Sequence, residues 1–326
     1  MSALPVETGR VRAVLSQHRP RYGEPIFRAA VLLASALVVG IIVGLVVVIA
    51  NESRAGIAHN GIAFLWGHTW DPVHSVFGAL PFIWGTLLTA ITALVLAMLV
   101  GVGVALFLVE LAPGWLAGPL GFMVEMLAAI PSVVYGLWGI FVLAPWLRDF
   151  VEVPLHDALG GLPFFSGYPI GIGNLAAVVV LTVMVLPTVA AVSRDVVAAV
   201  PTSQREAALA LGATRWEMIR VGVLPYARSG ILGAGILGLA RGVGETMAVT
   251  MVIGNAPTIS LSFLSQGYTM ASVIANEFTE ATTDLYRSSL IEIGLLLLLI
   301  TLVINAAARL LVWRVAYSAS SRSLLA

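Results

Sequence analysis

Six long apolar runs divide this chain, and their length limits the folds that are open to it. The runs cover about 29–50, 79–109, 119–147, 171–193, 230–254 and 288–313. A helix of roughly 20 apolar residues crosses a bilayer core of about 30 Å, so each run is long enough for one crossing. The runs predict an all-α integral membrane protein with about six transmembrane helices. Pro131 and Pro145 interrupt the third run, which is long enough to bend.

The scarcity of charge supports a membrane location and excludes several kinds of chemistry. Charged residues make up 10% of the 326 residues, whereas about a quarter of a typical soluble domain is charged. All 17 basic residues are arginines, and the chain has no cysteine. A chain without lysine has neither a Walker A phosphate loop nor a Schiff-base lysine. If ATP powers this protein, another chain must hydrolyse it.

The sequence contains no pattern typical of an intramembrane enzyme. No nucleophile–base pair and no set of metal ligands falls at membrane depth, so we expect no catalytic residues. His59, His68 and His74 share one expected loop, but their spacing matches no metal motif. We expect ordinary loop histidines and no metal site.

The arginines lie mainly on one side of the expected membrane. Five precede the first run, five lie between the fourth and fifth runs, and three follow the sixth, which makes 13. Only Arg54, Arg148 and Arg287 fall on the other side, and Arg241 lies inside a run. Positively charged loops stay in the cytoplasm. We therefore expect both termini and residues 194–229 to be cytoplasmic, as an even number of crossings also requires.

Segment 201–225 has the pattern of two short helices joined by a turn. Ser203 with Glu206, and Thr214 with Glu217, each form a potential capping box, which starts a helix. The residues alone allow two interpretations. The segment is either a well-capped connector without a partner or a rigid element on which another protein docks.

Small residues and a glycine in this segment suggest how docking would work. Ala207 and Ala208 permit close approach by another protein, and Gly212 falls where a left-handed residue would end the first helix. Together with Glu206 and the later Leu224-Pro225, they resemble the EAA loop of bacterial ABC importer permeases. That resemblance implies an ATPase-coupling role for Glu206, Ala207, Ala208 and Gly212. Gly222 replaces a usual aliphatic residue, so we expect the second helix to be loosened there.

Two charged residues in the fifth run are the main candidates for function. Arg241 and Glu245 are four residues apart, which would place them one turn apart on one helix face as an ion pair. A charge at membrane depth is costly and is usually paired or functional. A stripe of small residues beside them favours close helix–helix contact. Its members are Gly230, Ala234, Gly238 and Gly242.

The residues leave the role of this pair open. It is either a structural ion pair or a relay in which the arginine fork binds a phosphate-type oxyanion and the glutamate receives the guanidinium afterwards. Glu125 and Glu292 are also charged at membrane depth. Either they line a cavity or they pair with groups on a partner subunit.

A narrower resemblance suggests the substrate. Residues 240–249 (ARGVGETMAV) resemble the G-R-A-x-G-E-T-M-A-V signature of the C-type permease subunit of the phosphate-specific transporter, and 82–87 and 130–136 resemble the same subunit. The resemblance implies a type I ABC importer permease that forms half of the pathway of an ATP-driven inorganic phosphate importer in the bacterial plasma membrane. Its implied partners are an A-type permease subunit, two copies of a cytoplasmic ATPase that uses ATP-Mg, and an external phosphate-binding protein. No cofactor on this chain and no nucleic acid are implied.

The same resemblance assigns Arg241 and Glu245 to the substrate pathway. Ser132 and Tyr135 are secondary candidates, because a bend at Pro131 would expose polar groups to a cavity; helix packing is the alternative for both. A permease for molybdate or sulfate, or an ion-coupled transporter without a docking loop, are the competing functions.

The runs and loops also predict the organisation of the chain. The expected segments are a cytoplasmic N-terminal arm at 1–28, a first transmembrane helix at 29–50, an external loop at 51–78, a permease core at 79–315 that includes the loop 201–225, and a cytoplasmic tail at 316–326.

Overall fold

The computed structural model describes residues 23–323 in two units, divided after Asn51. The first unit consists of α2 (Gly23–Glu52), which contains the expected first transmembrane helix. Apolar side chains are exposed on all its sides, as expected for a helix surrounded by hydrocarbon. Residues 1–22 of the expected arm and residues 324–326 of the expected tail lie outside the described residues.

The second unit is built from helices of very different lengths. In the described residues we find no β-strand, only isolated bridges at 71–76 and 254–267. The helices are α3 (Arg54–Asn60), η1 (Gly61–Leu65), α4 (Leu80–Leu106), η2 (Phe107–Leu111), α5 (Gly114–Ala129), α6 (Ser132–Trp138), η3 (Gly139–Leu143), α7 (Ala144–Leu147), η4 (Arg148–Glu152), α8 (Val153–Leu159), α9 (Asn174–Ala198), α10 (Thr202–Ala210), α11 (Arg215–Met218), η5 (Ile219–Val223), α12 (Leu224–Val243), α13 (Met247–Val252), α14 (Met270–Glu277) and α15 (Asp284–Ser323).

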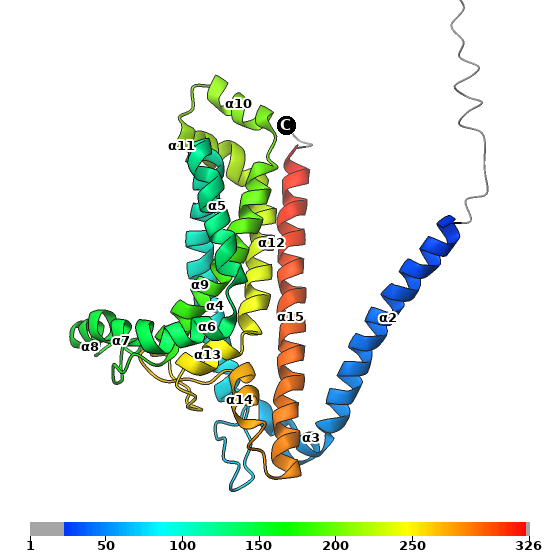
Figure 1. The fold of residues 1–326 in the computed structure, drawn as a ribbon, viewed down its shortest axis with the longest axis vertical. Coiled ribbons are helices and arrows are strands. Elements are labelled where there is room, and N and C mark those ends of the chain that lie inside the picture. Colours follow the sequence, from blue (N-terminus) through cyan, green and yellow to red (C-terminus); the bar gives the residue numbers. More distant parts are fainter. Residues whose placement is uncertain (1–22, 324–326) are drawn as a thin grey trace, which may run out of the picture. The chain divides into compact units, whose positions relative to one another are not determined.

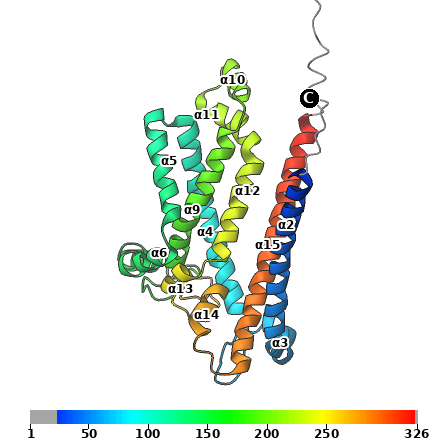
Figure 2. The same cartoon turned by 45° about the vertical axis from the view of Figure 1, so that its right-hand side comes forward.

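The centre of the second unit is a bundle of α4, α9 and α12, which run side by side in both Figure 1 and Figure 2. The predicted stripe of small residues on α12 packs against α9. A Cβ atom added at Gly230 would lie 2.5 Å from Cγ1 of Val196, and one at Gly238 would lie 2.9 Å from Cγ1 of Val185. The prediction of a close helix–helix seam is therefore confirmed.

The third apolar run is not a single helix, contrary to the prediction of one span at 119–147. α5 ends at Ala129, Ile130 is extended, and a new helix begins after Pro131. The residue before a proline is disfavoured in the helical conformation, which accounts for the break. α5 runs along the bundle, whereas the chain of short helices from α6 to α8 lies across its direction (Figure 1).

Six helices of the described residues are long and apolar enough to cross a membrane, which confirms a multi-pass membrane protein. Their bounds are Pro25–Glu52, Leu80–Leu111, Ser132–Leu159, Asn174–Ala198, Arg215–Val243 and Asp284–Arg314. α5 has 16 residues and is thus about 24 Å long, somewhat short for a full crossing. It packs against α9.

The two ends of the second unit differ in their arginine content. α10, α11 and the C-terminal part of α15 lie at one end, and α3 and α14 lie at the other (Figure 1). The first end carries the arginines of segment 194–229 with Arg309 and Arg314, and the second carries Arg54 and Arg287. α15 continues as a helix to Ser323, so most of the expected tail at 316–326 extends the last transmembrane helix.

Aromatic side chains fix the loops at the α14 end of the unit. The Trp70 ring lies edge-on to the rings of Phe77 and Phe82, with centroids 5.0 Å away in both cases. Trp70 Nε1 and the Tyr286 hydroxyl both donate to Oε2 of Glu277, at 2.8 and 2.7 Å. Burial raises the pKa of the neighbouring Tyr268, so this phenol stays protonated. The loop before α4 is thus held against α14 and α15.

Candidate functional site

The two main candidate residues lie at a break between helices. α12 ends at Val243, Gly244 and Glu245 follow, and α13 begins at Met247. The Glu245 amide donates to the carbonyl of Gly242 at 3.3 Å, a three-residue step that ends the α-helical register. Irregular backbone at membrane depth occurs where protein or a water-filled cavity surrounds it.

The predicted ion pair between Arg241 and Glu245 is wrong for this conformation. Glu245 lies beyond the helix end, so the two side chains do not share one helix face, and the described residues contain no salt bridge between them. The nearest polar contact of Glu245 is with the amide of Ala248, 3.5 Å from its Oε1. Gly242 and Gly244 flank the break and weaken the helix because glycine has a low helix propensity. The guanidinium of Arg241 is exposed beside the buried stripe of α12.

The helix α6 brings the secondary candidates to the same region. Gly136 on α6 faces α13 so closely that an added Cβ atom would lie 3.3 Å from Cα of Ala248. Ser132 is half-buried at the start of α6, and no hydrogen bond joins it to the other candidates in the described part of the chain.

The Tyr135 hydroxyl has a clear structural task. It donates to the carbonyl of Leu127 at 2.7 Å. Leu127 is the residue whose carbonyl would accept from the amide at position 131 in a continuous helix, and Pro131 has no amide hydrogen. The Leu127 carbonyl therefore accepts a weaker bond from the Ile130 amide at 3.4 Å together with the one from Tyr135, and this second bond across the break supports the helix-packing alternative for Tyr135.

The segment 201–225 forms the expected helix–turn–helix. The capping box of Thr214 and Glu217 is confirmed, with the Thr214 amide donating to Oε2 of Glu217 at 2.8 Å. The capping box of Ser203 and Glu206 is wrong, because α10 already begins at Thr202 after Pro201 and has no side-chain cap. The fixed φ of Pro201 favours a helix start two residues earlier, with Pro201 in place of Ser203 as the N-cap.

The two glycines of this segment have distinct functions. Gly212 has a φ of +84° between α10 and α11, so the predicted left-handed position is confirmed. Gly222 lies in η5, a π-helix over Ile219–Val223, so the second helix leaves α-helical geometry there, in line with the expected local loosening. A Cβ atom added there would lie 3.1 Å from the carbonyl oxygen of Gln204, so the glycine lets α10 pack closely on η5. Glu206 and Ala207 remain exposed on α10.

The other charged residues at membrane depth find partners within the chain. Arg194 on α9 lies 2.8 Å from Oε1 of Glu125 on α5, so Glu125 pairs within its own subunit, which neither of the two expectations for it included. Glu292 is buried and accepts from Nδ2 of Asn60 at 2.9 Å. A further ion pair, between Arg205 and Glu110, was not predicted because 95 residues separate its members. The described residues hold no group of three side chains suited to a metal ion.

Comparison with known proteins agrees with this architecture. Residues 97–317 match the family "Binding-protein-dependent transport system inner membrane component". One chain of the MetNI methionine ABC transporter, in an inward-facing form, superimposes with a TM-score of 0.51 at 20% identity, covering 76% of this chain and 99% of that one. At that identity, the likeness concerns the fold, and it confirms the expected ABC permease architecture.

Curated relatives give a closer match. The phosphate transport system permease protein PstC of Mesorhizobium japonicum is 43% identical over 296 residues, which is 90% of each chain. PstC of Pasteurella multocida is 47% identical over 259 residues, covering 78% of this chain and 81% of the relative. The chain therefore belongs to the binding-protein-dependent transport system inner membrane components, and within that family it groups with the PstC permeases.

Proposed function

We propose that this chain is the transmembrane permease subunit of an ATP-driven inorganic phosphate importer and forms half of its translocation pathway. The observation that carries the proposal is the 43% identity with PstC over 90% of both chains. The match extends along nearly the whole subunit, so it includes the helix break, the docking segment and the loops between the helices. Molybdate or sulfate is the less favoured substrate, because no relative reported above is named for either anion.

The helix break suggests how the subunit handles an anion. Arg241 is exposed and unpaired with Glu245, so its five N–H donors are available to a phosphate oxyanion in a fork geometry. A cation at this depth offsets part of the cost of moving an anion through a low-dielectric region. Glu245 lies beyond the break, where a change in the angle between α12 and α13 would bring it toward Arg241. Ser132 is half-buried on α6, which packs against α13, and remains a secondary candidate for the pathway, whereas the hydroxyl of the buried Tyr135 is taken up by the carbonyl of Leu127.

The remaining machinery is assigned to other chains. We propose an A-type permease as the second half of the pathway, two copies of a cytoplasmic ATPase that uses ATP-Mg, and an external phosphate-binding protein that delivers the anion. This chain is a permease and not an enzyme, and its lack of lysine leaves no Walker A loop. Glu206, Ala207, Ala208 and Gly212 of the segment 201–225 form the docking surface for the ATPase.

The function is tested by uptake into proteoliposomes that contain the complete complex, ATP inside and the loaded binding protein outside. We expect uptake of radiolabelled phosphate that requires ATP and the binding protein. Excess unlabelled phosphate should abolish it, and excess molybdate or sulfate should not. Uptake that either of these anions suppresses as well as phosphate does would contradict the assignment of substrate.

The orientation of the subunit is a second expected result. We propose that the α10 end and both termini lie in the cytoplasm of a bacterial plasma membrane, and the excess of arginine in the corresponding segments of the sequence supports this orientation. The chain has no cysteine, so single-cysteine variants can be labelled without background. Ser203→Cys should react with a membrane-impermeant maleimide only after permeabilisation. Tyr168→Cys, which is 87% exposed in the opposite loop, is the matched control and should react in intact cells. The reverse pattern would refute this topology.

A further inference from the structure

We propose that Arg205 is a positioning residue that holds the docking helix α10 against the ends of α4 and α9. Through this contact, a movement of the ATPase would be transmitted to these two helices of the bundle. The inference rests on the proposed function of the segment 201–225 and deepens it. It concerns a contact inside the subunit, whereas the docking surface itself faces outward.

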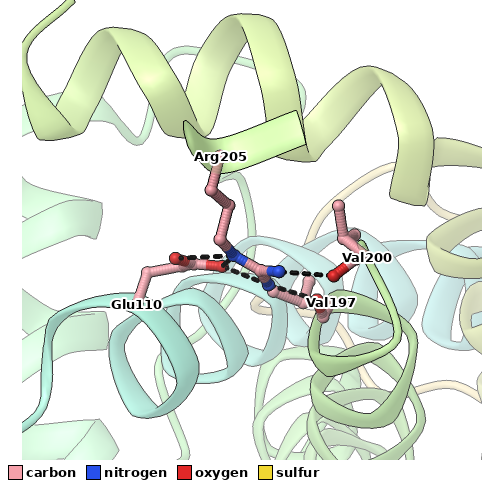
Figure 3. Close-up of polar contacts among 4 residues, drawn as sticks. All are labelled: Glu110, Val197, Val200 and Arg205. Atoms are coloured by element: carbon pink, nitrogen blue, oxygen red, sulfur yellow. Dashed lines mark hydrogen bonds and ion pairs between the residues drawn. The ribbon is translucent and has the colours of Figure 1, made fainter. Parts of the chain in front are cut away.

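Each of the three nitrogens of the Arg205 guanidinium donates a hydrogen bond (Figure 3). The Arg205 guanidinium donates to Glu110 through Nε at 3.0 Å and through Nη2 at 2.8 Å. Nη2 also donates to the carbonyl of Val197 at 2.9 Å, and Nη1 donates to that of Val200. One side chain thus joins α10 to the end of η2 and to the last turn of α9.

Burial makes this contact specific. The Glu110 side chain is 6% exposed and that of Arg205 is 18% exposed. A buried carboxylate needs a charged partner with good geometry, and a bidentate guanidinium supplies it. Val197 lies in the last turn of α9 and Val200 follows that helix. The Val197 carbonyl also accepts from the Val200 amide at 3.2 Å, so the group that depends most on Arg205 is the buried carboxylate of Glu110, which would lose its charged partner if α10 moved away.

The connectivity explains why such a fastening matters. Along the chain, α10 is joined to α9 by the short segment Ala199–Pro201 and to α12 through α11 and η5. No covalent path leads directly from α10 to α4, because Glu110 and Arg205 are 95 residues apart. Without Arg205, a displacement of α10 would be transmitted to α4 only through α9 and through the packing of the bundle. With it, α4, α9 and α10 move together.

Packing against η5 also holds α10 in a fixed position. Gly222 lets η5 approach the backbone of α10 at Gln204. The docking helix is thus held from two sides, by η5 and by the Arg205–Glu110 contact. Glu206 and Ala207, which follow Arg205, stay exposed toward a partner. A residue directed inward therefore precedes residues directed outward on the same short helix.

The first test measures coupling in the reconstituted importer. In Arg205→Met we expect assembled complexes that keep basal ATP hydrolysis, while the phosphate transported per ATP falls by about ten-fold or more. Stimulation of hydrolysis by the loaded binding protein should be lost as well. Arg205→Lys keeps the charge and should restore part of the ratio. The control Arg314→Met removes an exposed arginine at the same end of the unit and should leave the ratio unchanged.

The second test does not depend on phosphate. Spin labels at Leu211→Cys and Leu99→Cys, both on exposed positions, report the distance between the end of α10 and α4 in the lipid-embedded complex. We expect one narrow distance distribution with Arg205 and a clearly broader one in Arg205→Met. An unchanged distribution together with an unchanged phosphate-to-ATP ratio would overturn the inference while leaving the proposed function intact. If the wild-type complex imports no phosphate, the proposed function fails and the distance measurement still decides the role of Arg205.

A further variant distinguishes a coupling role of the Arg205–Glu110 contact from a role in folding alone. Should Arg205→Met fail to assemble, Glu110→Gln, which preserves the size of the side chain, is measured in the same two ways. A normal phosphate-to-ATP ratio in the variant that assembles, or failure of both variants to assemble, would assign the contact to folding alone and overturn the inference.

Discussion

Replacing Arg241 by glutamine is expected to give a complex that assembles normally and imports phosphate about 100-fold more slowly, because two charge-assisted hydrogen bonds to the anion are lost at about 1.5–3 kcal/mol each. Arg241 is exposed at the end of α12 and has no salt bridge with Glu245. Its removal therefore leaves no buried carboxylate without a partner. The defect should appear in the transport rate per assembled complex and not in the amount of complex.

Two further variants separate pathway from structure. If Arg241 only neutralised Glu245, the double variant Arg241→Gln with Glu245→Gln would transport normally; we expect it to remain as inactive as Arg241→Gln. Arg241→Lys retains the charge but loses the fork, so transport should be strongly impaired. Arg314→Met serves as the charge-matched control. Phosphate uptake by the double variant near the wild-type rate would rule out anion contact by Arg241.

The variant Gly212→Val is expected to lower transport-linked ATP hydrolysis by about ten-fold, because a side chain at a positive φ costs roughly 1–2 kcal/mol and β-branching adds to the strain. The φ of Gly212 is +84°. No heavy atom lies within 4 Å of a Cβ atom added at this position, so the variant introduces backbone strain without a steric clash. The subunit should still insert, and α10 should lose its fixed angle to α11.

Gly212→Asn is the matched control for this effect. Asparagine tolerates the left-handed region better than other residues with a Cβ atom, because its side chain bonds to the local backbone. It should retain most of the hydrolysis that the binding protein stimulates. Equal losses in Gly212→Asn and Gly212→Val would show that the side chain itself obstructs the ATPase, and normal activity in both would remove the docking role of this turn.

The features that were predictable from the sequence depend on local composition and spacing. Hydrocarbon imposes a minimum length on apolar helices, so the crossings were visible as runs. The stripe on α12 was predictable because small residues at a spacing of four are typical of close helix–helix contacts. The left-handed Gly212 was predictable because a glycine directly after a helical pattern commonly ends the helix in that conformation.

The features that were missed depend on competition between local signals or on distant pairing. The spacing of Arg241 and Glu245 predicts one helix face only if the helix continues, and the glycines around the break end it first. The close packing of Gly222 was missed because its neighbour, Gln204, lies on another helix. The contact of Arg205 with Glu110 joins two segments whose proximity only the folded bundle creates.

The glycine seam of α12 restricts where an ion can travel. Gly230 and Gly238 bring the backbones of α12 and α9 so close that the valines of α9 fill the interval between them, and a hydrated anion has no room there. Any conducting route must therefore pass outside this seam, and Arg241 is exposed at its edge. This subunit supplies one wall of a channel, and a second protein surface must close the other side before the route is sealed from lipid.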